Sequence, residues 1–78
     1  MSPKLPLVRV GDFEKILVHL VFERKRQKGS HVFYRHSDGR YTTLPFHGNQ
    51  EISRSLTRQI LREIEISIDE FHEYLAKI

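Results

Sequence analysis

The 78-residue chain contains no cysteine, so neither disulfide bonds nor thiolate-ligated zinc can stabilise a domain of this size. It also lacks any run close to the roughly 18 consecutive apolar residues that a membrane-spanning helix needs. The first ten residues, MSPKLPLVRV, lack the long apolar stretch of a secretory signal peptide. We therefore expect a single domain over residues 1–78, a cytosolic location and no membrane contact.

Negative charge is scarce in the first two thirds of the chain. Residues 1–50 carry nine Lys or Arg against four Asp or Glu, and residues 51–78 carry four against six, which together give the net charge of +3. Four of the five residues from Arg24 to Lys28 are cations. The first 50 residues are therefore the candidate anion-binding part. The alternative is the mixed surface of an ordinary soluble domain.

Helical and extended patterns follow one another in a simple order. Apolar residues at helical spacing predict a first helix over residues 11–22, with Asp12 as its N-cap. The stretches HVFYRH and YTTLPF, joined by SDGR, predict a β-hairpin that ends at Pro45. A further strand over about residues 22–27 is expected at the edge of the sheet, because a lone hairpin is marginal in water.

The last third of the chain has helical patterns. After the loop HGNQ, apolar residues recur every four positions and predict a helix over residues 53–64. The sequence SIDE, Ser67 to Glu70, has the form of a capping box that opens a short last helix. The predicted fold is α+β in the order α-β-β-β-α plus the short C-terminal helix. A three-stranded antiparallel sheet has its helices packed on one face, and the other face is free to bind.

Alternation along the second predicted strand separates its side chains into two sets. One set is His31, Phe33 and Arg35, and the other is Val32, Tyr34 and His36. If the second set packs against the helices together with Leu44, then Phe33 is an exposed aromatic residue among cations on the open face. A protein partner or a nucleobase would cover such a residue.

Histidines are the candidate reactive groups, because the chain has no thiol, no Walker-type phosphate loop and no His-Glu-x-x-His motif. His31 and His36 are expected on opposite faces, which argues against a metal site that they share with His47. No cofactor is expected. The imidazole of a free histidine titrates at about pH 6.5, so it can accept and return a proton at neutral pH. His47 and Tyr34 are the candidates for a second acid–base group.

RNA carries its own nucleophile in the 2′-OH, so a small domain can cleave it with few groups. One histidine would move the proton, Lys28 and Arg26 would supply positive charge, and the N–H groups of Gly29 and Ser30 would stabilise the charge that develops on the phosphate. The alternative is that the Gly-Ser pair only turns the chain and that the histidine after it only begins a strand.

An ordered set of segments resembles a known family. These are Phe22, RQKGSH, an aromatic strand, SDGR, LPFH and ILREIEIS. Together they are similar to the HicA family, the toxins of type II HicA–HicB toxin–antitoxin pairs, over about Gly11 to Phe71. The resemblance implies a fold like that of double-stranded-RNA-binding domains. It also implies a ribosome-independent mRNA endoribonuclease that uses His31, of the Gly-Ser-His motif, as its catalytic residue. Cleavage through the 2′-OH of RNA is expected to need no metal.

The resemblance also implies partners. The partners are mRNA and a HicB-type antitoxin that covers the histidine, with no DNA contact by this chain alone. The expected RNA-binding residues are Arg26, Lys28, Gly29, Ser30, Arg40 and His47. The family usually has Gly-Phe where this chain has Val21-Phe22, so Val21 is expected to lengthen the first helix or to alter its exit. A non-catalytic RNA-binding module and a protein-interaction domain are the alternative functions.

Overall fold

The computed structural model describes residues 5–78, and the first four residues of the expected domain and of the MSPKLPLVRV stretch lie outside the described residues. The elements, in chain order, are β1 (Val8–Arg9), α1 (Val10–His19), β2 (Glu23–Lys28), β3 (His31–Arg35), β4 (Tyr41–Pro45), β5 (Glu51–Ile52), α2 (Arg54–Ile64) and α3 (Ile68–Lys77). The predicted α+β class is confirmed. Among the described helices, none has both the length and the apolar character needed to cross a bilayer.

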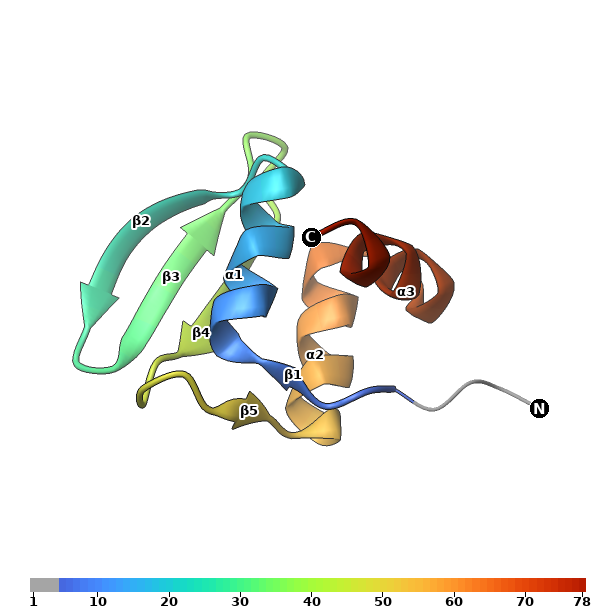
Figure 1. Cartoon of the computed structure of the whole chain (residues 1–78). Coiled ribbons are helices and arrows are strands. Elements are labelled where there is room, and N and C mark those ends of the chain that lie inside the picture. Colours follow the sequence, from blue (N-terminus) through green and yellow to red (C-terminus); the bar gives the residue numbers. More distant parts are fainter. Residues whose placement is uncertain (1–4) are drawn as a thin grey trace.

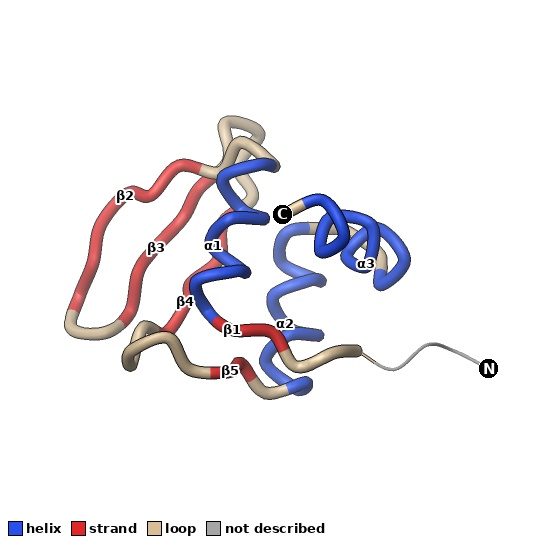
Figure 2. The backbone as a smooth tube through the Cα atoms, viewed as in Figure 1, coloured by secondary structure: helices blue, strands red, loops and turns tan. Residues whose placement is uncertain are grey.

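The main sheet is antiparallel, with the strand order β2-β3-β4, so β2 lies at an edge as predicted. Figure 1 shows α1 and α2 on one side of this sheet and α3 beyond them. Side chains of β3 and β4 that point toward these helices, among them Val32, Tyr34 and Leu44, are buried. The β2–β3 ribbon extends away from the helices, as the tube in Figure 2 also shows, and its other face is open.

The first helix begins earlier than predicted, and the prediction of Asp12 as its N-cap is wrong. Arg9 occupies the cap position and makes no side-chain cap hydrogen bond. The side chain of Asn49, from the loop before β5, accepts a hydrogen bond from the Gly11 N–H at 3.1 Å. The Val10 N–H donates to the carbonyl of Gln50 at 2.9 Å. The loop therefore satisfies two of the four free N–H groups that every helix start exposes.

Val21 does not lengthen α1 but ends it. Its φ is 67°, in the left-handed region that glycine normally occupies. The Val21 N–H donates to the carbonyl of Val18 at 3.0 Å, and the Phe22 N–H donates to that of Leu17 at 2.9 Å. This pair of bonds is the Schellman motif, formed here without glycine. It turns the chain from α1 directly into β2.

The C-terminal helices agree closely with the predictions from the sequence. Ser53 caps α2 by accepting from the Leu56 N–H. The capping box of Ser67 and Glu70 is present in full at the start of α3. The short antiparallel pair of β1 and β5 was not predicted. This pair ties the segment before α1 to the loop before α2.

Candidate nucleic-acid interface

The open face of the main sheet carries three cross-strand rows of side chains. From the register, the rows are Lys28, His31 and Pro45; then Arg26, Phe33 and Thr43; then Glu23, Arg35 and Tyr41. Burial alternates along β3, with His31 and Arg35 exposed and the residues between them on the helix face buried. The predicted placement of His31, Phe33 and Arg35 on the open face is therefore confirmed.

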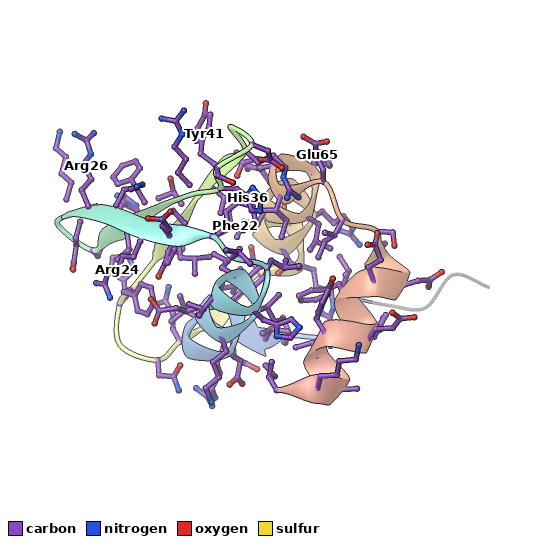
Figure 3. The ribbon with its side chains drawn as sticks, turned by 90° about the horizontal axis from the view of Figure 1, so that it is seen from above. Phe22, Arg24, Arg26, His36, Tyr41 and Glu65 are labelled. Atoms are coloured by element: carbon purple, nitrogen blue, oxygen red, sulfur yellow. The ribbon has the colours of Figure 1, made fainter. Side chains whose placement is uncertain are left out.

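A β-bulge decides which cations of β2 share this face. Regular alternation would put Arg24, Arg26 and Lys28 on one side of the strand. The register shifts between Arg24 and Arg26, so Lys25 is the extra residue that opposes no partner. Arg26 then lies opposite Phe33 and Lys28 opposite His31, whereas Arg24 faces the helices. In Figure 3, Arg24 and Arg26 accordingly extend to opposite sides of the β2–β3 ribbon.

A two-residue turn joins β2 to β3 and directly precedes the proposed reactive histidine. Gly29 has a φ of 60° and is the first residue of the turn, the position that favours glycine in a type II′ hairpin. A Cβ on Gly29 would meet no atom within 4 Å, so the space above the turn is open. Neither the Gly29 nor the Ser30 N–H donates to a backbone carbonyl within the described chain. His31 follows at once, exposed at the start of β3.

His47 lies beside the same turn. Its Nε2 is 3.2 Å from the hydroxyl oxygen of Ser30, and the adjacent Phe46 N–H donates to the Ser30 carbonyl at 2.6 Å. The loop after β4 is thereby held against the β2–β3 turn. The structure thus brings together five of the residues expected from the sequence: Lys28, Gly29, Ser30, His31 and His47.

A pocket of about 240 Å³ lies at His31, between β4 and α2. The helix side of the pocket is formed by Leu56, Gln59 and Glu63. The Glu63 carboxylate also accepts a hydrogen bond from the buried Thr42 hydroxyl at 2.8 Å, which fixes one wall. The imidazole of His31 therefore borders a concave space with polar groups opposite it. Over residues 5–78, no three His, Asp or Glu side chains gather into a metal-binding cluster.

Two residues expected at the site lie elsewhere. Arg40 is in the β3–β4 hairpin, at the opposite end of β3 from His31, and its guanidinium donates to Asp38 and to the carbonyl of Ile64. Hydrogen bonds from the Arg40 N–H and guanidinium hold the pKa of Asp38 below its usual range. These contacts make Arg40 a tie between the hairpin and the end of α2. Tyr34 is on the buried face, with its hydroxyl bonded to Glu14 rather than directed at the open face.

Arg35 and Tyr41 are open-face residues that the sequence did not single out as contacts. Tyr41 is 68% exposed and lies directly opposite Arg35. A sequence signal for this pair existed, because HVFYR and YTTLP alternate regularly on both sides of SDGR. Combining that alternation with a five-residue hairpin loop would have placed Tyr41 on the His31 face.

Comparison with protein families gives a match that covers most of the chain. A protein-family model described as the HicA toxin of bacterial toxin–antitoxin systems matches residues 10–66, more than half of the chain. The match runs from the start of α1 past the end of α2. It therefore includes the whole open face and the turn before His31. No curated protein matches the chain.

Proposed function

Because the chain belongs to the HicA toxin family of bacterial toxin–antitoxin systems, we propose that it is a ribosome-independent endoribonuclease that cleaves mRNA with His31 as its acid–base group. The observation that carries this proposal is the position of His31. It is exposed, follows a turn with open space above Gly29, and lies opposite Lys28 across the hairpin. Phosphodiester cleavage needs a proton acceptor, N–H donors and a cation. His31 supplies the acceptor, the turn supplies the N–H donors, and Lys28 supplies the cation.

The proposed reaction uses the nucleophile that RNA already contains. His31 takes the proton of the 2′-OH while the 2′-oxygen attacks the phosphorus. The bond between phosphorus and the 5′-oxygen breaks, and the departing oxygen takes a proton from water. The protonated His31 then gives its proton to the hydroxide that remains, which restores the neutral imidazole and water. The products are a 2′,3′-cyclic phosphate and a 5′-hydroxyl, and no metal takes part. Lys28 and the N–H groups of Gly29 and Ser30 stabilise the extra negative charge of the transition state.

His47 and Arg26 complete the proposed RNA contacts. His47 holds Ser30 through the 3.2 Å contact and adds a polar group beside the scissile phosphate. Arg26 lies one row further along the open face. We also propose that a HicB-type antitoxin is the protein partner and that it blocks cleavage by covering His31. Arg40 has its guanidinium occupied by protein oxygens, so it has no part in the proposed contacts.

The test compares purified wild-type protein with His31→Ala on a single-stranded RNA, each with and without excess chelator. We expect His31→Ala to lower the cleavage rate by roughly 10²- to 10⁴-fold, the usual contribution of a general acid or base. His19→Ala is the matched control, since His19 is also exposed but lies on α1 and contacts Tyr74. Its cleavage rate should equal that of the wild type.

Three outcomes would contradict the proposal. Unchanged cleavage by His31→Ala removes this residue from the reaction. Loss of wild-type cleavage in chelator removes the metal-free mechanism. RNA binding without any cleavage by the wild type would leave a non-catalytic RNA-binding module. Replacing the 2′-OH with 2′-hydrogen at the cleavage position should also stop the reaction, because the attacking group is then missing.

A further inference from the structure

The open face extends well beyond His31, and its far end has an aromatic residue that the cleavage reaction does not use. Tyr41 is 68% exposed at the start of β4, opposite Arg35. In Figure 3, Tyr41 and Arg26 extend to the same side of the sheet, away from α1. Successive rows on β3 are two residues apart, so the Arg35 row lies roughly 13 Å from His31. The face is therefore long enough to hold nucleotides beyond the cleaved bond.

The second and third rows combine flat rings with free cations. The Arg26 guanidinium carbon is 5.0 Å from the centroid of the Phe33 ring. Between these side chains, Arg35 and Tyr41 is a pocket of about 230 Å³. Among the described residues, neither Arg26 nor Arg35 pairs with a carboxylate. Their charges are thus available to an anionic ligand.

We propose that Tyr41 stacks against one nucleobase of single-stranded RNA, an inference that rests on the proposed RNA-cleaving function. The Phe33 ring, with the Arg26 guanidinium over it, lies beside the stacked base, and Arg35 binds an adjacent phosphate. Stacking on aromatic rings and guanidinium planes is how proteins hold unpaired bases, and every base offers a flat face to it. A duplex keeps its bases stacked on one another, so this subsite selects single strands. It positions the strand so that a phosphate a few nucleotides away reaches His31.

Charge favours RNA over a protein as the occupant of this end of the face. The two rows at this end include the cations Arg26 and Arg35 but a single acid, Glu23. The Glu23 carboxylate already pairs with Lys25 at 3.3 Å. The centre of a protein interface is usually more apolar and less charged than this. A track of cations with rings between them is typical of single-strand binding grooves.

The test measures RNA binding by fluorescence anisotropy in the His31→Ala background, so that the RNA stays intact. The probe is a single-stranded RNA of about 12 nucleotides, within the site size of small single-strand binders. Tyr41→Thr removes the ring but keeps a good strand former, and it should weaken binding by roughly 5- to 100-fold. Tyr41→Phe keeps the ring and should bind as well as the parent. Val18→Thr is the control, an exposed apolar residue on α1.

A scan of single abasic positions along the RNA identifies the stacked base. One position should weaken binding in the parent and should have no effect in Tyr41→Thr, because the ring and the base act as a pair. The same substitution in the active protein should raise KM and leave kcat nearly unchanged. Circular dichroism melting of each variant shows whether the fold is intact.

The outcomes separate this inference from the proposed function. If the wild type cleaves RNA but Tyr41→Thr binds it as tightly as the parent, the subsite is refuted and the face is left to a protein partner. If the wild type does not cleave RNA but the abasic scan still depends on Tyr41, the subsite stands and the nuclease proposal fails. An equal loss at every abasic position, or none, would also overturn the subsite.

Discussion

The strained residue at the end of α1 provides a direct test of how this fold is stabilised. Val21 has a φ of 67°, and its N–H and that of Phe22 close the helix. A side chain in the left-handed region costs roughly 1–2 kcal/mol relative to the right-handed one. A residue branched at Cβ is especially rare there. Glycine has no such cost, so Val21→Gly should increase the free energy of unfolding.

The expected gain follows from three contributions. Removing the strain contributes roughly 1–2 kcal/mol. The extra freedom of glycine in the unfolded chain offsets roughly 0.5–1 kcal/mol of this. The Val21 side chain is 69% exposed, so its loss removes little buried apolar surface. The net stabilisation should be about 0.5–1 kcal/mol, which raises Tm by roughly 2–8 °C in a domain of this size.

Thermal unfolding followed by circular dichroism measures this gain against two controls. Val21→Ala keeps a Cβ in the left-handed region and should gain less than Val21→Gly. Val18→Gly puts glycine inside the same helix at another exposed position, where it should cost roughly 0.3–0.5 kcal/mol relative to valine. If Val21→Ala stabilises as much as Val21→Gly, the gain comes from removing an exposed apolar side chain and the strain argument fails. A lower Tm for Val21→Gly would also refute it.

Three other predictions concern the helix contacts and the charges of β2. Burial, then the hydrogen bond to Glu14 and its negative charge, raise the pKa of Tyr34 above its usual 10.0. Above about pH 10 the unfolded chain therefore loses a proton that the folded chain keeps, so the free energy of unfolding should fall by up to about 1.4 kcal/mol per pH unit. Urea unfolding of the wild type between pH 8 and pH 11 should show this fall, and Tyr34→Phe should not show it. Arg26→Gln should lower the slope of log Kd against log salt for single-stranded RNA by about 0.7, whereas Arg24→Gln, on the helix side, should leave the slope unchanged. Asn49→Ala should lower stability by about 1 kcal/mol in urea unfolding, because it removes the acceptor for the first turn of α1, and Asn49→Asp should restore it.

The parts of the fold that the sequence predicted are those with local signals. The helix over 53–64 and the SIDE capping box depend on residues three or four apart, and both are present. The start of α1 depends instead on Asn49, which is 38 positions from Gly11. The strands β1 and β5 have two residues each, too few to show any alternation. Such elements form only because tertiary contacts bring distant segments together.

The candidate site was predictable where one strand alone decided the outcome. Alternation along HVFYR separated His31 from the apolar set that packs against the helices. Arg40 lies next to the predicted turn, and nothing in SDGR shows that the carbonyl of Ile64 will occupy its guanidinium. A long side chain finds its partner only in the folded molecule. The expectation that Arg40 binds RNA depended on its positive charge alone.

The β-bulge at Lys25 is the feature on which the charge of the open face depends. Counting by two along β2 from Arg24, which faces the helices, would put Arg26 and Lys28 on that same side, away from His31. The one extra residue moves both to the His31 face, where they lie opposite Phe33 and His31. No glycine or proline marks the position, because any residue tolerates the right-handed conformation of a simple bulge. The positive face is therefore made by a backbone irregularity, and the number of residues between Arg24 and the Gly29 turn matters as much to it as their charge.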